Sequence, residues 1–164
     1  MRRMIALWVM MTVLAAATPL SMVTLEGNKI GMQNIEGNFL FQNDAYRKGN
    51  LILFFFGTRC PYCAKEMPQI EKMYQNGEIT VIGVEAQAAG SDGEIRRFVR
   101  SEGITFPVLN RASGKRLVDY LIARRLWIGG VPYYIWVDRY GNLEPLDFRE
   151  LARFRSAAHP SPRE

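Results

Sequence analysis

The run Leu51–Phe56 is apolar at every position and ends in three phenylalanines. A run of this length without polar alternation is typical of a strand buried on both faces, as in α/β proteins. Gly57 breaks the run, and the residues that follow Cys60 repeat apolar side chains at helical spacing. The pattern therefore predicts a buried strand and then a helix that begins at Pro61 and ends at 76–77.

The same two patterns alternate along the rest of the chain. They predict first a strand over 80–86 and then a helix that Ser91 or Asp92 caps and Gly103 ends. A short extended segment over 106–109 follows, and then a helix through 117–122 that ends near 129–130. The last predicted element is a hairpin of strands 133–137 and 142–145. Strands that alternate with helices are typical of one α/β domain. We expect this domain to cover residues 24–155, and the Pro-, Ser- and Arg-rich residues 156–164 to form a disordered tail.

The N-terminal segment, residues 1–17, has the pattern of an export signal. Arg2 and Arg3 precede an almost unbroken apolar run, and three alanines stand at 15–17, where a signal peptidase reads small residues. The chain stays fairly apolar to Val23, and about 20 apolar residues span a bilayer, so an uncleaved membrane anchor is one alternative. A buried core helix is another. Both export interpretations predict a periplasmic protein.

Composition narrows the class of protein. The chain has 164 residues, of which 48% are hydrophobic and 12% aromatic, which allows one domain with a real core and excludes a disordered or collagen-like chain. The net charge is +5, and two of these positive charges lie in the N-terminal segment. The remaining charge is too small to indicate nucleic-acid binding, and no cluster of Lys and Arg is interleaved with aromatic residues.

The chain has two cysteines, Cys60 and Cys63, separated by Pro61 and Tyr62. A disulfide between them would close a loop too small to restrict the unfolded chain, so it would add little stability. A structural zinc site usually has four ligands, and the one histidine is His159 in the tail. The remaining interpretation is a redox-active pair, which export would place where disulfides persist.

The predicted helix start gives the two cysteines different roles. Cys60 stands at the helix N-terminus, where free backbone N–H groups and the helix dipole favour the thiolate. Cys63 lies one turn inside the helix and is expected to be less exposed. We therefore expect Cys60 to attack a partner's sulfur and Cys63 to resolve the mixed disulfide. Arg59 is either a further positive charge beside the thiolate or a solvated loop residue.

Glu66 lies three residues after Cys63 and therefore on the same helix face. There it could accept the proton of Cys63, directly or through water. The alternative is an ordinary exposed helical glutamate. Pro68 removes one helical hydrogen bond and predicts a bend in the helix.

Three stretches of the chain resemble a known family. They are Phe55–Pro68, which contains the Cys-Pro-Tyr-Cys motif, Gly103–Val108, and Gly130–Pro132 followed by Asp138–Asn142. Together they resemble the exported thioredoxin-like thiol–disulfide oxidoreductases of the TlpA/ResA type, over about residues 27–146. The Cys-x-x-Cys spacing alone would be weak. Its combination with a buried strand, Glu and Pro at fixed offsets, and a later Val-Pro before a strand is specific.

The resemblance implies a thioredoxin-like α/β fold. This fold has a central mixed sheet flanked by helices, and the family adds an N-terminal β-hairpin, which Gly31–Gly37 resembles. The resemblance also implies that Cys60 is the nucleophile, that Cys63 is the resolving thiol, and that Glu66 is the acidic residue that assists proton transfer.

The resemblance further implies that the Val131–Pro132 peptide is cis and lies beside the cysteines. In that position it would expose the backbone of Val131 for pairing with a substrate strand. We expect Arg59, Pro61 and Tyr62, which surround the cysteines in the sequence, to contact the substrate as well.

The chain departs from the family pattern at three places. Arg59 replaces the usual Trp, Phe54 stands where thioredoxin itself buries an acidic residue, and residues 130–134 lack the signature of dedicated cytochrome c maturation reductases. The second departure leaves Glu66 as the nearer candidate for proton transfer. The third weakens a strict assignment to cytochrome c maturation.

We expect an exported thiol–disulfide oxidoreductase that exchanges electrons with protein disulfides, as a reductant, with cytochrome c maturation as one candidate process. Its redox group would be the Cys60–Cys63 disulfide, without a cofactor or metal. Expected partners are protein thiols and disulfides and a membrane electron donor of the thiol-reductase type, but not nucleic acid. Two alternatives remain: an oxidant or isomerase that serves a secretion or conjugation system, and a Cu(I)-binding chaperone that uses both thiolates.

Overall fold

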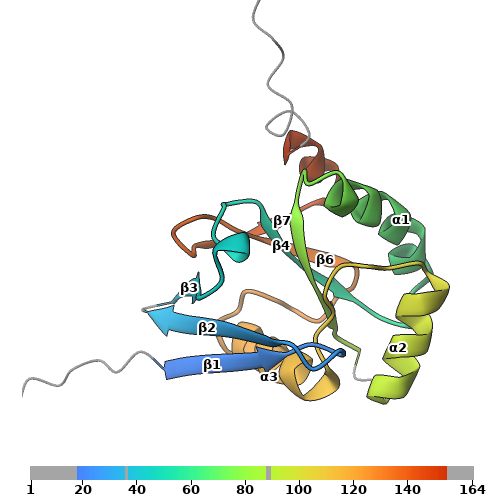
Figure 1. Cartoon of the computed structure of the whole chain (residues 1–164), viewed down its shortest axis with the longest axis horizontal. Helices are drawn as coiled ribbons and strands as arrows, with labels where there is room; N and C mark the ends of the chain where they lie inside the picture. Colours follow the sequence, from blue (N-terminus) through green and yellow to red (C-terminus); the bar gives the residue numbers. More distant parts are fainter. Residues whose placement is uncertain (1–17, 36, 88–89, 155–164) are drawn as a thin grey trace, which may run out of the picture.

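The computed structural model describes residues 18–35, 37–87 and 90–154 (Figure 1). At its centre lies a four-stranded sheet with the strand order β5-β4-β6-β7. The strands are β4 (Leu51–Phe56), β5 (Thr80–Glu85), β6 (Tyr133–Val137) and β7 (Leu143–Leu146). β5 runs parallel to β4, whereas β6 is antiparallel to β4 and β7 is antiparallel to β6. The predicted central mixed sheet is confirmed.

Helices cover both faces of this sheet. They are α1 (Pro61–Gln75), α2 (Asp92–Ser101) and α3 (Arg111–Ala123), together with the short 3₁₀ turns η1 (Asp44–Tyr46) and η2 (Phe148–Leu151). Phe54 and Phe56 of β4 pack in one core cluster with α1 and α2, whereas Leu53 and Phe55 pack in the other with α3. All residues of β4 are 0% exposed, as predicted for a strand covered on both faces.

A second, antiparallel sheet lies beside α3 (Figure 1). Its strands, in the order β1-β2-β3, are β1 (Thr18–Val23), β2 (Lys29–Ile35) and β3 (Asn38–Phe41). Met22, Ile30 and Phe39 join the core cluster that contains α3. The expected N-terminal hairpin is the β2–β3 pair, and β1 extends it. Although we expected the domain to begin at residue 24, β1 pairs with β2 along its whole length and is part of the fold.

The predicted helix starts agree with the structure. Cys60 is the N-cap of α1, and Ser91 is the N-cap of α2. Ser91 and Glu94 form a capping box, in which each side chain accepts a hydrogen bond from the other residue's backbone N–H. Pro68 lies within α1, which continues beyond it to Gln75. The start of α1 therefore places Cys60 as expected.

The end of α3 differs from the prediction. We expected this helix to end near 129–130, but it ends at Ala123. Arg125, with a φ of 56°, adopts the left-handed conformation that usually favours glycine. The turn that follows brings Trp127 onto Phe55 in the core, with ring centroids 5.9 Å apart. Packing of Trp127 thus ends the helix before the glycines are reached.

Two expected segments lie outside the described residues. These are the leader, residues 1–17, and the tail, residues 156–164. Of the helices in the described part of the chain, none is both long enough and apolar enough to cross a membrane.

Candidate active site

The two cysteines lie where β4 ends and α1 begins. Gly57 follows the strand, and its carbonyl oxygen accepts a hydrogen bond from the Cys60 N–H at 3.1 Å. The side chain of Gln87 lies against Gly57, in the space that a Cβ atom would occupy. This tight turn brings the chain from the buried strand directly into the helix.

The sulfur of Cys60 caps the helix. Its Sγ accepts a hydrogen bond from the N–H of Cys63 at 3.2 Å, in the role that a Ser or Asp oxygen usually plays. The position that the sequence predicts for Cys60, at the mouth of the helix, is confirmed.

Cys60 also faces the segment that leads into β6. Its thiol lies 3.7 Å from the carbonyl oxygen of Val131, to which it can donate. The Val131–Pro132 peptide is cis, as the resemblance implied. Cys60 is 8% exposed and Cys63 is 0% exposed, and both are free thiols. The expected difference in access between the two cysteines is therefore present.

Burial raises the pKa of the Cys63 thiol to about 12. The hydrogen bond with Cys60 and the charges of Cys60 and Glu66 act in the same direction, and the backbone of Gly57 opposes them. Cys63 is therefore protonated at neutral pH. Because the thiolate is the nucleophile, Cys63 needs a base before it can attack.

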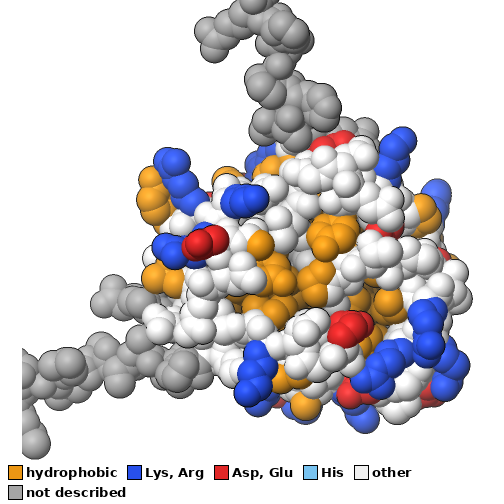
Figure 2. All heavy atoms as spheres, in the orientation of Figure 1, with side chains coloured by type: hydrophobic (Ala, Val, Ile, Leu, Met, Phe, Trp, Pro, Cys, Tyr) orange, Lys and Arg blue, Asp and Glu red, His pale blue; other side chains and the backbone are white. Residues whose placement is uncertain are grey.

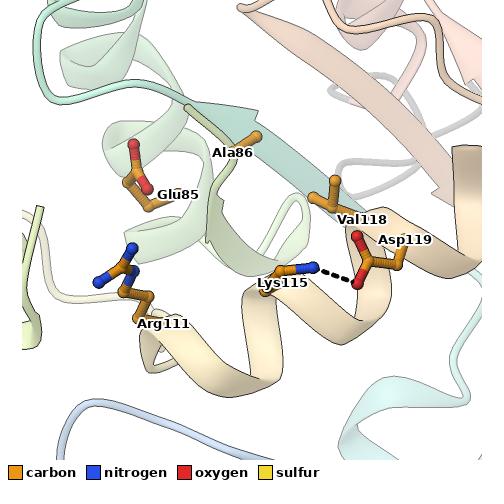
Figure 3. A pocket seen from close by; sticks show the side chains of 6 residues that line it. All are labelled: Glu85, Ala86, Arg111, Lys115, Val118 and Asp119. Carbon is orange, nitrogen blue, oxygen red and sulfur yellow. Dashed lines mark hydrogen bonds and ion pairs between the residues drawn. The ribbon is translucent and has the colours of Figure 1, made fainter. Parts of the chain in front are cut away.

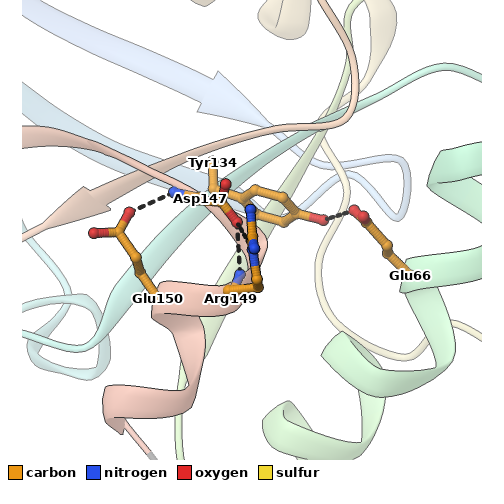
Figure 4. Close-up of polar contacts among 5 residues, drawn as sticks. All are labelled: Glu66, Tyr134, Asp147, Arg149 and Glu150. Atoms are coloured by element: carbon orange, nitrogen blue, oxygen red, sulfur yellow. Dashed lines mark hydrogen bonds and ion pairs between the residues drawn. The ribbon is translucent and has the colours of Figure 1, made fainter.

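Glu66 lies one turn beyond Cys63 and is half-buried. Its Oε2 accepts a hydrogen bond from the hydroxyl of Tyr134 at 2.5 Å (Figure 4). Its charge lies close enough to Cys63 to contribute to the raised pKa of that thiol. Glu66 thus differs from an ordinary exposed helical glutamate, because its carboxylate is held between α1 and β6.

Tyr134 is a site residue that we did not predict. Its side chain is 2% exposed, and its ring stacks on Phe54 with centroids 5.1 Å apart and an interplanar angle of 9°. Phe54 occupies the position at which thioredoxin buries an acidic residue. The available signal was the period of two along a strand, which puts Tyr134 on the same face as Pro132.

A pocket of about 270 Å³ opens beside Glu66. Its lining residues come from α1, β6, β7 and the segment that begins η2: Glu66, Pro132, Tyr134, Leu146, Asp147 and Phe148. Asp147 is exposed, and its Oδ1 lies 3.5 Å from Nε of Arg149 (Figure 4). The Arg149 N–H donates to the same oxygen and lowers the pKa of the Asp147 carboxyl. Two carboxylates therefore line this pocket.

Exposed side chains surround the cysteines in the chain. Tyr62 is 70% exposed, and Arg59 and Pro61 are exposed as well. Ile128, which we did not predict, is 94% exposed and lies three residues before Val131.

Two aromatic side chains hold the loop between α3 and β6. The indole Nε1 of Trp127 donates to the carbonyl oxygen of Gly130 at 2.8 Å. The hydroxyl of Tyr133 donates to the carbonyl oxygen of Leu126 at 2.7 Å. Trp127 itself is 5% exposed. These contacts fix the chain immediately before Val131, whose carbonyl oxygen faces Cys60.

Two further pockets in the described part of the chain are not lined by either cysteine. One is lined by Glu85, Ala86, Arg111, Lys115, Val118 and Asp119, and its Lys115 and Asp119 form an ion pair at 2.6 Å (Figure 3). The other is lined in part by Tyr46, Tyr74 and Thr80, and Thr80 begins β5 at the end of the sheet opposite the cysteines.

On the face in Figure 2, hydrophobic side chains gather in a central hollow with Lys and Arg around its edge. Within the described residues, no group of three or more His, Cys, Asp or Glu side chains could hold a metal ion.

Comparison with known proteins gives a family match over most of the chain. Residues 21–145 match the model of the AhpC/TSA family. The chain is 36% identical over 122 residues to a thiol-disulfide oxidoreductase ResA of Halalkalibacterium halodurans. The aligned residues cover 73% of the chain and 58% of that protein. A thioredoxin-like protein of Haemophilus influenzae is 27% identical over 90 residues, which cover 55% of the chain and 53% of that protein. The chain thus spans less than two thirds of the length of these relatives.

Solved structures with a similar fold cover most of the described chain. StoA from Bacillus subtilis superposes with a TM-score of 0.58 at 22% identity, over 86% of this chain and 98% of that one. The thioredoxin domain of a thiol-disulfide oxidoreductase from Bacteroides vulgatus gives a TM-score of 0.59 at 20% identity, over 87% and 94% of the two chains. This likeness confirms the predicted thioredoxin-like fold.

Proposed function

The chain belongs to the AhpC/TSA family, and from this premise we propose that it is a thiol–disulfide oxidoreductase with Cys60 and Cys63 as its reactive pair. The observation that carries the proposal is the setting of the Cys60 sulfur, 3.2 Å from the N–H of Cys63 and 3.7 Å from the carbonyl oxygen of Val131. One thiol, 8% exposed, caps the helix, and a thiol that is 0% exposed follows it one turn later. The identity of 36% to a protein named as a thiol-disulfide oxidoreductase supports the same chemistry.

Reduction of a substrate disulfide would proceed in two exchanges. The Cys60 thiolate attacks one substrate sulfur, a mixed disulfide forms, and the other substrate sulfur leaves as a thiolate that takes up a proton. Cys63 then gives its proton to Glu66 and attacks the sulfur of Cys60. The Cys60–Cys63 bond forms, the bond to the substrate breaks, and the second substrate sulfur leaves as a thiolate. The protein loses two electrons and the substrate gains them.

Each residue has a task in the proposed steps. The sulfur of Cys60, which lies at the N-terminus of α1, is the nucleophile of the first exchange. Cys63, with its pKa raised to about 12, attacks only after Glu66 has taken its proton. The backbone of Val131, beside cis-Pro132, pairs with the extended substrate chain. Arg59, Pro61 and Tyr62 contact the substrate around the sulfurs.

The proposed cellular role is that of an exported reductant. An apolar leader over residues 1–17 would deliver the domain to the periplasm, either free or anchored, and a membrane thiol reductase would return electrons to the disulfide. The likeness to proteins named thiol-disulfide oxidoreductase ResA supports the redox chemistry of this role. Cytochrome c maturation is the candidate process within the proposal. The direction of exchange depends on the reduction potential, since related motifs span roughly −270 to −120 mV.

Reduction of insulin disulfides by the protein with dithiothreitol tests the activity. The wild-type protein should accelerate the appearance of free insulin B chain, and Cys60→Ser should not. Turnover by Cys60→Ser at the wild-type rate would contradict the proposal. Equilibration with glutathione buffers then gives the potential, and a value near the oxidising end of that range would replace the reductant role with that of an oxidant.

A further inference from the structure

Between Glu66 and the core lies the buried hydroxyl of Tyr134, which has no place in the two exchanges above. Resting on the proposed function, we propose that Tyr134 is a positioning residue: its hydroxyl holds the carboxylate of Glu66 in place beside Cys63, where the carboxylate accepts the proton of that thiol.

The hydrogen bond defines which carboxylate oxygen remains available. The hydroxyl of Tyr134 donates to Oε2 of Glu66 at 2.5 Å, and this leaves Oε1 to accept a proton. A glutamate on a helix surface would otherwise sample several rotamers that point into solvent. Tyr134 therefore selects the orientation that a proton acceptor needs.

The ring of Tyr134 is held in place by packing, and its hydroxyl can act only as a hydrogen-bond donor. Its ring stacks on Phe54 and lies 6.0 Å from the ring of Phe148, so its hydroxyl cannot turn away from α1. Burial raises the pKa of Tyr134, and the hydrogen bond to Glu66 raises it further. The phenol stays protonated throughout the working range of the protein and serves as a donor.

The pocket beside Glu66 gives the proton taken from Cys63 a route to solvent. On α1 the carboxylate faces Cys63 and, beyond it, Cys60, and both sulfurs also act on the pKa of Tyr134. On the other side it lines the open pocket with Asp147, which remains charged because its pKa is lowered by the Arg149 N–H.

The test compares Tyr134→Phe with Tyr120→Phe. Tyr120 lies on α3, and its hydroxyl accepts a hydrogen bond from Asn34 at 2.5 Å, so the control also loses one phenol contact, but away from the cysteines. Rapid acid quench resolves the formation of the mixed disulfide from its resolution, each followed against pH. Thermal unfolding of both variants reports whether they are folded.

Tyr134→Phe should leave the attack by Cys60 unchanged and slow resolution about tenfold near neutral pH. The deficit should shrink as the pH rises, because Cys63, whose pKa is raised, then ionises without the carboxylate. Tyr120→Phe should change neither the rate nor the profile. If Tyr134 acts through Glu66, the double variant Glu66→Gln/Tyr134→Phe should be no slower than Glu66→Gln alone.

Each contrary result has a distinct meaning. Slow resolution in Glu66→Gln together with a wild-type rate and profile in Tyr134→Phe overturns the positioning role and leaves the proposed function in place. If the double variant slows resolution by the product of the two single effects, the positioning role is overturned as well. Tyr134 would then act independently of Glu66, in a purely structural role. A wild-type rate in Glu66→Gln overturns the role of the carboxylate and this inference together.

Discussion

The sulfur of Cys60 lies 3.7 Å from the carbonyl oxygen of Val131, although 71 residues separate them in the chain. The contact joins the two halves of the candidate site, the start of α1 and the cis peptide before β6. A substrate strand that pairs with Val131 would bring its own sulfur next to that of Cys60. The position of Val131 should therefore govern how well substrates bind.

The hydrogen bond from Trp127 to Gly130 should hold Val131 in place for substrate binding. Trp127→Phe keeps an aromatic ring against Phe55 but removes the donor to the Gly130 carbonyl, so we expect kcat/KM for a peptide disulfide to fall about three- to tenfold, mainly through KM. Trp136→Phe is the matched control, because it loses a similar bond to Gly49 outside the site. Equal effects of the two substitutions would contradict a role for the loop.

The raised pKa of Cys63 predicts strongly selective alkylation. At neutral pH iodoacetamide should modify Cys60 at least about a hundredfold faster than Cys63, which is buried and whose pKa is raised to about 12. Modification of Cys63 in the folded protein should increase as the pH rises towards 12. Peptide mapping by mass spectrometry measures both rates, and equal labelling of the two thiols at neutral pH would be the contrary result.

Glu66→Gln should slow resolution of the mixed disulfide about a hundredfold near neutral pH, because Cys63 loses its proton acceptor. Since the pKa of Cys63 is raised, the variant should recover as the pH rises and the thiol ionises by itself. Quenched-flow kinetics against pH measure this recovery. Glu144→Gln, an exposed carboxylate on β7, is the control and should behave as wild type. A deficit that does not depend on pH would argue against proton transfer.

Local features of the sequence predicted the cysteine pair and its setting. The apolar run that ends at Gly57 and the proline at Pro61 mark a strand and a helix start, so the N-cap position of Cys60 could be assigned without tertiary information. The burial of Cys63 and the helix face of Glu66 follow from helical spacing. The cis peptide at Val131 came from the family resemblance and not from the local pattern.

What the sequence did not predict depends on contacts between distant segments. Tyr134 lies 68 residues from Glu66, and no local pattern reports that their side chains meet. The end of α3 was placed too late because Arg125 adopts a conformation that glycine usually marks. Trp127 packs into the core just beyond it, and this contact outweighs the preference of the local residues. Tertiary packing decided both features.

The turn between β6 and β7 should be sensitive to a side chain at Gly141. This residue has a φ of 84°, its carbonyl accepts the N–H of Phe39, and a Cβ would lie 2.5 Å from the Phe39 carbonyl oxygen. Gly141→Ala should therefore lower the free energy of unfolding by at least about 2 kcal/mol. Gly77→Ala is the control: its φ is 71° with no atom within 4 Å of the added Cβ, and its cost should be about 1 kcal/mol. Urea unfolding measures both, and equal losses would contradict the close contact with Phe39.

The central claim is that Cys60 attacks the substrate and Cys63 resolves the product, and trapping the mixed disulfide tests it most directly. Cys63→Ala and Cys60→Ala are each incubated with a peptide that contains one disulfide, and adducts are measured by intact-mass spectrometry. The account predicts a stable adduct through Cys60 in Cys63→Ala and none in Cys60→Ala, because Cys63 is buried and protonated. An adduct through Cys63 in Cys60→Ala, or no adduct in either variant, would contradict it.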